Sequence, residues 1–421
     1  MKDNRFDYLI VGSGAGGATL AKELAQRRKS VLVVEAGKDE KKIGTSLDAN
    51  RYYDIKKSKE GVIIWQARMA GGSTVVSCGN GVRCLEKELD DFGIDLSKEF
   101  VQAEQEMHIA PIAERLLSSG SKAIMQAAKE LGYDMKMMPK FIDPKVCRKC
   151  GNCTRGCAKG AKWTALSYLE DAKKNGTETL YETRVKEIII DSGKAKGIRC
   201  VGREGIREIF ADAVILAAGG IGTPIILQNS GIKDAGAGLF VDLFVNVYGV
   251  TDNDKLNLVF EPTMTLVNLD FHQTKGFLLS PFVAHSRMTR FREFGLRGFT
   301  LPHKRTLGIM IKTTDEPVGR VYPDGSISKP VTEKDWKRIR EGSSIAKEIL
   351  IKAGAKSVMV SKVQGGHPGG TAAIGRVVDK NFQTKVDGLF VCDASVLPVT
   401  PGLPPILTIV ALAKRLAKVL T

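Results

Sequence analysis

The stretch 6-FDYLIVGSGAGGATLAKELAQRRKSVLVVEAG-37 decides how this chain begins to fold. A short apolar run leads into three glycines, Gly12, Gly14 and Gly17, and a segment of helical composition follows them. A second apolar run then ends at Glu35. One strand, one glycine-rich turn, one helix and a second strand within about 30 residues match the size of a dinucleotide-binding βαβ unit.

Each glycine of this turn has a distinct expected role. Gly12 allows a tight turn, Gly14 lets the backbone approach a pyrophosphate, and Gly17 lets the helix pack closely on the strand. The N-terminus of the helix would offer its free N–H groups to the phosphates. Glu35 can accept hydrogen bonds from a ribose 2′-hydroxyl, whereas it would repel a 2′-phosphate. The unit therefore predicts FAD or NAD rather than NADP, because the flanking strands and helix disfavour an ordinary turn.

The composition is that of a soluble globular protein, with 43% hydrophobic and 26% charged residues. The 421 residues are enough for two domains. The net charge of +16 comes from lysines and arginines spread along the chain, so no segment resembles a nucleic-acid-binding module. A basic surface would suit an acidic electron-carrier protein or a partner subunit.

The two ends of the chain bear on its location. The start, MKDNRFDYLI, lacks the charged and then apolar pattern of a secretory leader. The most apolar segment, 406–420, is interrupted by Lys414, Arg415 and Lys418, so no transmembrane segment is expected. We therefore expect a cytoplasmic protein, and in that setting the eight cysteines are expected to be reduced thiols or metal ligands.

A cysteine-rich segment at 140–165 carries Cys147, Cys150, Cys153 and Cys157 with the spacing C-x2-C-x2-C-x3-C. This is the spacing of bacterial ferredoxins, and it predicts an iron–sulfur cluster of the 4Fe–4S type. Ala158 stands where a proline usually follows, and a three-iron cluster held by three thiolates is an alternative. A zinc site and a thiol-rich turn without metal are further alternatives, although zinc ribbons usually separate two C-x2-C pairs widely.

The rest of the chain divides into two kinds of sequence. Residues 213–224, which include Ala218, form an apolar run that enters a second glycine-rich turn. Residues 239–356 are rich in β-forming residues and carry a predicted helix at 333–353. We therefore predict an α/β protein with a discontinuous FAD-binding, Rossmann-like domain at 1–238 and 357–421. Residues 239–356 would form a smaller substrate domain on an antiparallel sheet.

Four segments together resemble one family, the glucose-methanol-choline (GMC) oxidoreductases. They are GSGAGG with Glu35, the GGST turn at 71–74, AAGGIGTP at 217–224, and the terminal set HPGGT, VCDAS and GLPPILTIVALAKRLA. Members of this family are flavoproteins that oxidise alcohols. The resemblance implies an FAD domain of the glutathione-reductase type assembled from separate segments, with a substrate domain beside it.

The resemblance also implies roles for individual residues. The expected FAD contacts are Gly12, Gly14, Gly17 and Glu35 at the ADP part, Val185 at the adenine, Asp393 and Ala394 at the pyrophosphate, and Gly72, Ser73 and Pro405 at the isoalloxazine. Ala218 belongs to the second glycine-rich turn, where the backbone is expected to approach a ligand. His367 matches the family's active-site histidine.

The chain departs from the family at one active-site position. Members usually carry a second His or an Asn there, whereas this chain has Pro404. The imidazoles of His272, His285 and His303 are the candidate replacements. The sequence thus predicts an FAD-dependent CH–OH dehydrogenase that passes electrons through the iron–sulfur cluster to a protein acceptor. Two alternatives are an iron–sulfur flavoprotein that reduces an activated double bond or carbonyl, and a non-catalytic electron-transfer subunit.

Overall fold

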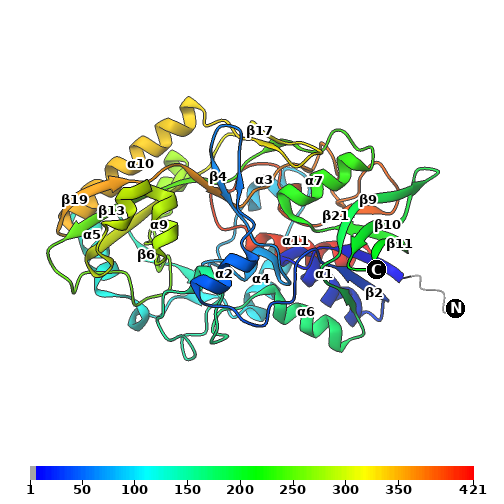
Figure 1. The fold of residues 1–421 in the computed structure, drawn as a ribbon, viewed down its shortest axis with the longest axis horizontal. Coiled ribbons are helices and arrows are strands. Elements are labelled where there is room, and N and C mark those ends of the chain that lie inside the picture. The colour runs from blue at the N-terminus through cyan, green and yellow to red at the C-terminus, as the bar shows by residue number, and fades with distance from the viewer. Residues whose placement is uncertain (1–5) are drawn as a thin grey trace.

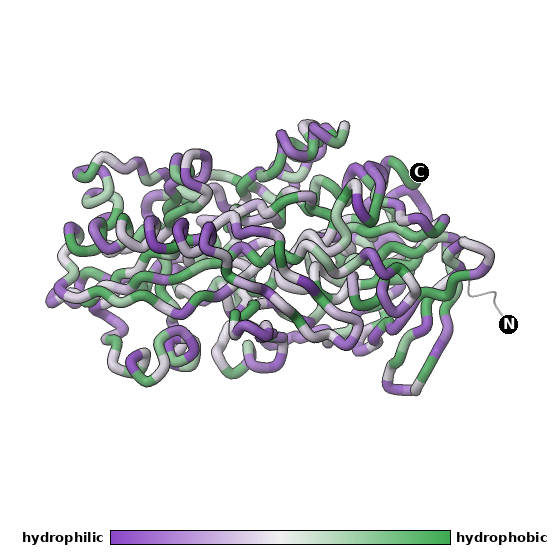
Figure 2. The backbone as a smooth tube through the Cα atoms, turned by 90° about the horizontal axis from the view of Figure 1, so that it is seen from above, coloured by the Kyte–Doolittle hydropathy of each residue, from purple (hydrophilic) through white to green (hydrophobic). Residues whose placement is uncertain are grey.

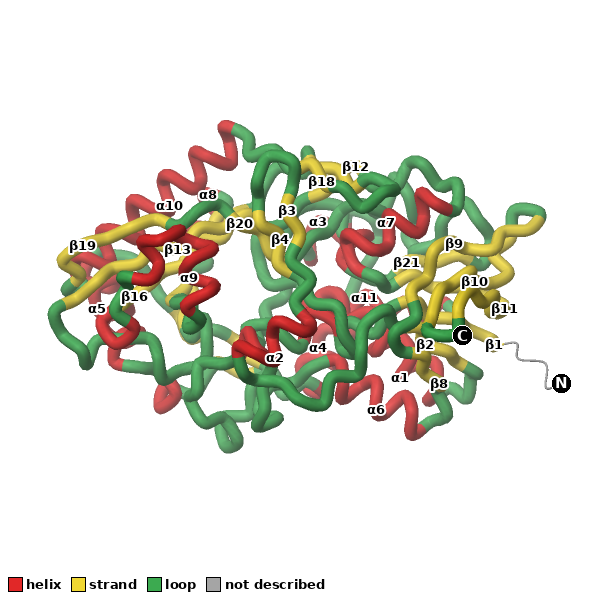
Figure 3. Tube along the Cα trace, viewed as in Figure 1, coloured by secondary structure: helices red, strands yellow, loops and turns green. Residues whose placement is uncertain are grey.

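The computed structural model describes residues 6–421 and contains two large sheets. Figure 1 shows them at opposite ends of an elongated molecule, and Figure 3 shows long loop segments between them. The α-helices are α1 Ala15–Gln26, α2 Ser46–Tyr52, α3 Glu86–Asp90, α4 Ser97–Glu106, α5 Ser119–Glu130, α6 Ala165–Lys174, α7 Gly219–Asn229, α8 Asp270–Lys275, α9 Arg287–Phe294, α10 Glu333–Lys352 and α11 Ile406–Val419.

The first sheet has the strand order β8-β2-β1-β11-β10-β9, and β21 pairs with β11. Its strands are β1 Phe6–Val11, β2 Val31–Val34, β8 Glu178–Leu180, β9 Arg184–Asp191, β10 Lys194–Gly202, β11 Gly205–Leu216 and β21 Leu389–Val391. The strands β8, β2, β1, β11 and β21 are parallel, whereas β9 and β10 pair antiparallel. The strand, helix and strand predicted for residues 6–37 are thus β1, α1 and β2.

The second sheet has the order β15-β16-β13-β20-β4-β3, and β19 pairs with β13. Its strands are β3 Lys56–Lys57, β4 Ile63–Trp65, β13 Leu243–Thr251, β15 Phe277–Pro281, β16 Thr306–Thr313, β19 Ala355–Val360 and β20 Gln364–Gly366. Its central pairings are antiparallel. The sheet joins strands from the predicted substrate domain to strands on either side of it, and the division at residues 238 and 357 stays a prediction.

Seven short strands complete the structure. They are β5 Ala110–Pro111, β6 Lys136–Met137, β7 Pro139–Lys140, β12 Ala237–Leu239, β14 Leu266–Val267, β17 Gly319–Val321 and β18 Ile327–Ser328. Three of them, β12, β17 and β18, form a small sheet of their own.

Among residues 6–421, the two largest of four hydrophobic core clusters lie one at each end of the molecule. The larger core packs α1, α11 and the parallel strands, and the other packs α10 and α5 against the second sheet. Figure 2 shows hydrophobic stretches running through the middle of the molecule and hydrophilic residues on many of the outer turns. The helix predicted at 333–353 is α10, which begins at a capping box between Thr332 and Asp335. The α/β fold class predicted from the sequence is confirmed.

Lys414 shows why charges inside the terminal helix do not place that helix on the surface. Its side chain is fully buried, and its ammonium lies 2.7 Å from both Glu23 of α1 and Glu106 of α4. A buried cation with two carboxylate partners is compensated, so α11 can lie between α1 and α4. In the described part of the chain, no helix has both the length and the apolar character needed to traverse a lipid bilayer.

Candidate active site

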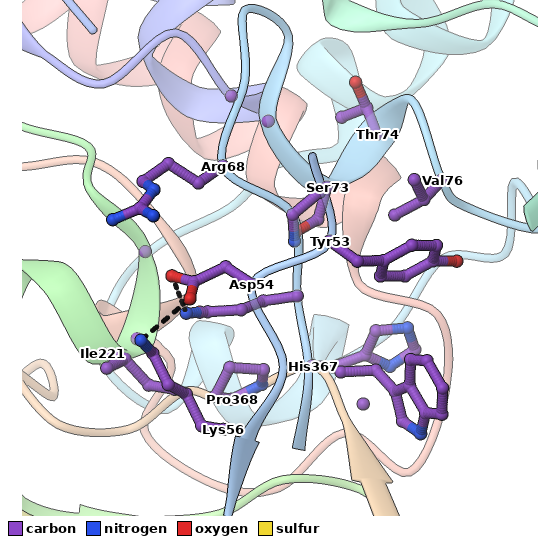
Figure 4. Close-up of a pocket in the computed structure, with 18 of the residues that line it drawn as sticks. Tyr53, Asp54, Lys56, Arg68, Ser73, Thr74, Val76, Ile221, His367 and Pro368 are labelled. Atoms are coloured by element: carbon purple, nitrogen blue, oxygen red, sulfur yellow. Dashed lines mark hydrogen bonds and ion pairs between the residues drawn. The ribbon is translucent and has the colours of Figure 1, made fainter. Parts of the chain in front are cut away.

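One cavity of about 770 Å³ runs from the β1–α1 turn of the first sheet to the second sheet. It collects eleven of the predicted site residues from segments far apart in the sequence. These are Gly12, Gly14, Glu35, Gly72, Ser73, Val185, Ala218, His367, Asp393, Ala394 and Pro405. Figure 4 shows part of the cavity, where Tyr53, Ser73 and His367 approach one space from different segments.

The three glycines of the first turn have different surroundings. Gly12 has a φ of +103°, and a Cβ built on it would lie 2.3 Å from the carbonyl oxygen of Ala217. A Cβ on Gly17 would lie 2.0 Å from the carbonyl oxygen of Gly12, so Gly17 lets α1 pack on the turn. A Cβ on Gly14 would meet no protein atom within 4 Å. Gly14 therefore faces open cavity, and Gly17 lies behind the turn rather than at the cavity wall.

Glu35 is buried at the end of β2 and is held by the glycine-rich turn. One carboxylate oxygen accepts hydrogen bonds from the N–H of Ser13 (3.0 Å) and its hydroxyl (2.7 Å), and the other accepts from the N–H of Gly37 (2.7 Å). Burial raises the pKa of Glu35, and these hydrogen bonds oppose that rise. The carboxylate therefore fixes the turn, and its contact with a ribose stays a prediction.

Asp393 orients the start of α7 from the opposite wall of the cavity. Its Oδ2 accepts hydrogen bonds from the N–H of Gly219 (2.8 Å) and the hydroxyl of Thr223 (2.5 Å). Its Oδ1 accepts from the N–H of Ser395 (2.8 Å). These bonds fix the N-terminal turn of α7 at the cavity wall, where free N–H groups and the helix dipole favour an anion. The sequence did not indicate Thr223 as part of this arrangement.

These residues fit a bound dinucleotide such as FAD. The N-terminal turns of α1 and α7 both line the cavity, and Gly14 leaves room for a ligand where any other residue would place a side chain. Val185 lies near Glu35, because the N–H of Thr183 donates to the carbonyl oxygen of Glu35 (3.0 Å), whereas His367 directly follows β20 of the second sheet. We call the part of the cavity near Glu35 the nucleotide end and the part near His367 the reaction end.

His367 lies at the reaction end and is paired with a buried aspartate. Its Nδ1 lies 2.8 Å from Oδ2 of Asp242, whose side chain is fully buried. The other oxygen of Asp242 accepts a hydrogen bond from the N–H of Gly402 (3.0 Å). Both His367 and Asp242 adopt positive φ values, +90° and +46°. Such conformations are uncommon for residues with side chains and cluster at functional sites.

Lys312 of β16 is a second basic group at this end of the cavity. Its Nζ lies 3.4 Å from Nδ1 of His367, and the residue lines the cavity. Within residues 6–421, this is the only hydrogen-bonding contact recorded for its ammonium. Burial lowers the pKa of Lys312, and Asp242 opposes that effect. Burial raises the pKa of Asp242 to about 7, and burial together with Lys312 lowers the pKa of His367 well below its usual value.

The three histidines that could replace the polar active-site residue absent at Pro404 differ in their position relative to the cavity. Pro404 itself lines the cavity, as does His285. His272 lies 2.7 Å from the carbonyl oxygen of Pro401 through Nε2, outside the cavity lining. The ring of His303 meets the ring of His285 edge to face, with centroids 5.7 Å apart, and His303 does not line the cavity. The side chains that contact His367 are instead those of Asp242 and Lys312. The sequence indicated neither of them.

The four cysteines of the 147–157 segment lie outside the cavity lining. Across residues 6–421, no group of three or more His, Cys, Asp or Glu side chains is placed to hold a metal ion. Cys150 is exposed, and the other three are partly buried. Burial raises the pKa of Cys147, and Cys153, Cys150 and Cys157 lie close enough to raise it further. The four thiols nevertheless form no metal-holding group among the described residues. The predicted iron–sulfur cluster is therefore unsupported.

Comparisons with known proteins place the chain in one family. The family models for the N- and C-terminal parts of GMC oxidoreductases match residues 6–244 and 319–413. The chain is 32% identical to an uncharacterised protein of Methanocaldococcus jannaschii, over 98% of this chain and 99% of that protein. It is 23% identical to a long-chain-alcohol oxidase of Arabidopsis thaliana, over 96% of this chain and 66% of the oxidase.

Solved structures share the fold at low sequence identity. The chain superposes on pyridoxine 4-oxidase from Mesorbium loti with a TM-score of 0.77, 17% identity and coverage of 98% of this chain and 99% of that one. A formate oxidase of Aspergillus oryzae gives a TM-score of 0.78 at 17% identity, over 99% and 98% of the two chains. The family predicted from the sequence is thus confirmed. The chain belongs to the GMC oxidoreductases, an FAD-dependent enzyme family.

Proposed function

We propose that this protein oxidises a CH–OH group of a small molecule to a carbonyl, with His367 as the general base. The reaction removes the hydroxyl proton and a hydride from the carbinol carbon, so the C–H bond breaks as the C=O double bond forms. Bound FAD would supply the two-electron acceptor for that hydride. The residues expected to hold it are those at the nucleotide end of the cavity and the segment at Pro405. The FAD domain would comprise residues 1–238 and 357–421.

The observation that carries the proposal is the His367–Asp242 pair at the reaction end of the cavity. An ionised Asp242 can only accept a hydrogen bond, so Nδ1 of His367 must carry the proton at their 2.8 Å contact. The other ring nitrogen, Nε2, is then unprotonated and can accept a proton. The lowered pKa of His367 keeps the ring neutral and ready to act as a base.

We further propose that Lys312 takes the place of the polar residue that Pro404 cannot supply. Its ammonium lies 3.4 Å from Nδ1 of His367 and has donors without a recorded protein acceptor among residues 6–421. Both His367 and Lys312 line the cavity, so a substrate bound there can meet the imidazole and the ammonium. Lys312 would stabilise the alkoxide as the proton leaves.

The electron acceptor is a separate part of the proposal. The dehydrogenase prediction rested on an iron–sulfur cluster, and the four cysteines form no metal-holding group among residues 6–421. The comparison proteins whose names state an activity are oxidases. We therefore propose dioxygen as the first acceptor to test, with an acidic electron-carrier protein as the alternative that the basic charge favours.

Anaerobic stopped-flow absorbance of the FAD-loaded protein tests the reaction. Primary alcohols, 2-hydroxy acids and polyols are mixed with the protein, and flavin bleaching is followed. We expect at least one class to bleach the flavin, and His367→Ala to slow bleaching by roughly two to four powers of ten. Bleaching at an unchanged rate in this variant would remove His367 from the mechanism. If no class bleaches the flavin and an activated double bond reoxidises dithionite-reduced flavin, the protein is a reductase.

Lys312→Met tests the second proposed group in the same assay. We expect a loss of roughly two to three powers of ten, because a preorganised donor is removed from the developing charge. Lys312→Gln keeps a neutral donor and should lose less. Lys304→Met is the matched control, since Lys304 lies just before β16 and is exposed to solvent. Equal rates for Lys312→Met and the control would exclude Lys312.

A further inference from the structure

The segment 286–305, called the rim segment here, forms part of the rim of the cavity. It contains α9 and two short 3-10 turns at Gly295–Phe299 and His303–Arg305. Ser286, Met288, Thr289 and Arg292 line the cavity from this side. Residues of α2 line the same cavity.

The rim segment exposes an unusual number of large apolar side chains. Leu296 is 78% exposed, Met288 and Phe299 are each 53% exposed, and Phe291 is 38% exposed. The rings of Phe291 and Phe299 pack on each other with centroids 5.2 Å apart. Their contact is thus with one another at the surface rather than with a core. Clustered exposed apolar side chains commonly mark an interaction site.

The charges of the rim segment are almost all positive. Its basic residues are Arg287, Arg290, Arg292, Arg297, Lys304 and Arg305, and its one acidic residue is Glu293. Glu293 is buried and accepts hydrogen bonds from Asn246 (2.7 Å) and Tyr248 (2.9 Å). Arg290 is buried as well and donates to the carbonyl oxygen of Leu301 (2.8 Å). The inner face is therefore anchored, and the exposed charged side chains of the outer face are all cations.

The exposed apolar side chains and the cations of the rim segment together favour one kind of partner. A short basic segment with exposed Phe, Leu and Met matches interfacial segments that insert apolar side chains at the headgroup boundary while cations meet anionic lipids. A second copy of this chain carries the same basic face and a net charge of +16, so like charges oppose a symmetric contact. We propose that the rim segment docks the protein peripherally on an anionic lipid surface, with the cavity rim turned toward the membrane.

Docking in this orientation has a consequence for the substrate. Met288 and Arg292 belong to both the rim segment and the cavity lining, so a lipid-dissolved alcohol would meet the cavity at the membrane surface. This consequence rests on the proposed alcohol oxidation. The docking itself does not, because it requires only the surface residues and can be measured without turnover.

Vesicle co-sedimentation of the full-length, FAD-loaded protein tests the docking. Phosphatidylcholine vesicles with about one quarter phosphatidylglycerol are compared with pure phosphatidylcholine vesicles, and we expect binding only to the anionic ones. Arg287→Gln and Arg297→Gln should each weaken binding about fivefold. Leu296→Ser should weaken it several-fold at high salt, where the charge contribution is screened.

Matched controls lie on the β10–β11 hairpin, at the other end of the molecule (Figure 1). Ile206 is 72% exposed, and Arg203 lies beside it. Ile206→Ser removes an exposed aliphatic side chain, and Arg203→Gln changes the net charge by the same amount as the rim variants, although Arg203 is paired with Glu182. Both variants should leave vesicle binding unchanged. Far-ultraviolet circular dichroism and flavin content check that every variant is folded.

Three results would overturn the proposal. One is equal loss of binding in rim and hairpin variants, because this would mean that net charge alone drives the association. Another is the absence of binding to anionic vesicles by the folded wild-type protein. The third is a dimer in analytical ultracentrifugation that Leu296→Ser dissociates, because the rim segment would then be a contact between copies.

Discussion

The two ends of the cavity are built in opposite ways. At the nucleotide end, Gly12, Gly14, Gly17 and Glu35 come from one continuous stretch whose strands and helix form locally. At the reaction end, His367 meets Asp242 from 125 positions away in the chain and Lys312 from 55 positions away. A local motif can therefore be recognised in the sequence, whereas the group of His367, Asp242 and Lys312 comes together only when the second sheet forms.

The largest expected effect distinguishes two glycines of the β1–α1 turn. One allows the backbone to pack closely, and the other leaves space for a ligand. Gly17→Ala places a Cβ 2.0 Å from the carbonyl oxygen of Gly12, whereas Gly14→Ala meets no protein atom within 4 Å. We expect Gly17→Ala to destabilise the protein by several kcal/mol, as overpacking against backbone does. Gly14→Ala should keep the fold and lose FAD. Thermal unfolding and flavin content measure the two effects, and equal stability losses would contradict the comparison.

The second largest effect is expected at the His367–Asp242 pair of the reaction end. Asp242→Asn keeps the shape of the side chain but can donate a hydrogen bond to Nδ1 of His367, which would leave the proton on Nε2. We expect flavin reduction by substrate to slow by roughly two to four powers of ten, because the imidazole can then no longer accept the substrate proton. FAD content should be unchanged. A rate within a factor of two of the wild type would show that Asp242 does not set the tautomer.

The pH dependence follows from the same pair. Burial raises the pKa of Asp242 to about 7, so the carboxylate is ionised above that pH and protonated below it. Only the ionised form holds the proton on Nδ1 of His367. The rate of flavin reduction should therefore fall as the pH drops below about 7, and Asp242→Asn should lack this acidic limb. Lys312, Gly402 and His272 oppose the rise in this pKa, so Lys312→Met should shift the limb to higher pH.

A smaller effect is expected at the wall of the nucleotide end. Thr223→Val removes one of the two hydrogen bonds that reach Oδ2 of Asp393. Loss of a bond to a buried carboxylate costs about 1–3 kcal/mol, and FAD affinity should fall because the start of α7 is less well fixed. Isothermal titration of the apoprotein with FAD measures this. An unchanged affinity would mean that Gly219 alone orients the helix.

The smallest effect is expected at the cysteines. Replacing Cys147, Cys150, Cys153 and Cys157 together by serine should leave flavin reduction and thermal stability nearly unchanged, because these thiols neither line the cavity nor form a metal-holding group among residues 6–421. Iron analysis and electron paramagnetic resonance of protein purified without oxygen give the independent check. Stoichiometric iron in the wild type would restore the cluster predicted from the spacing.

Much of the fold could be predicted because its signals are local. The alternation of apolar runs, glycines and a helical segment in residues 6–37 indicates β1, α1 and β2, and the capped segment at 333–353 indicates α10. Cysteine spacing is also a local signal, but it predicts only which thiols could bind one metal site together. It does not state whether the backbone brings them together, so the metal prediction was not supported.

The sequence by itself determined the family and the βαβ unit with its glycine-rich turn, and it indicated His367 as a candidate, because each signal lies in neighbouring residues whose chemistry is recognisable. Tertiary structure alone decided that Asp242 and Lys312 flank His367 while His272 and His303 do not reach the cavity. The physical reason is that antiparallel register between β13, β16 and β20 sets which side chains share one end of the sheet. No local pattern encodes that register.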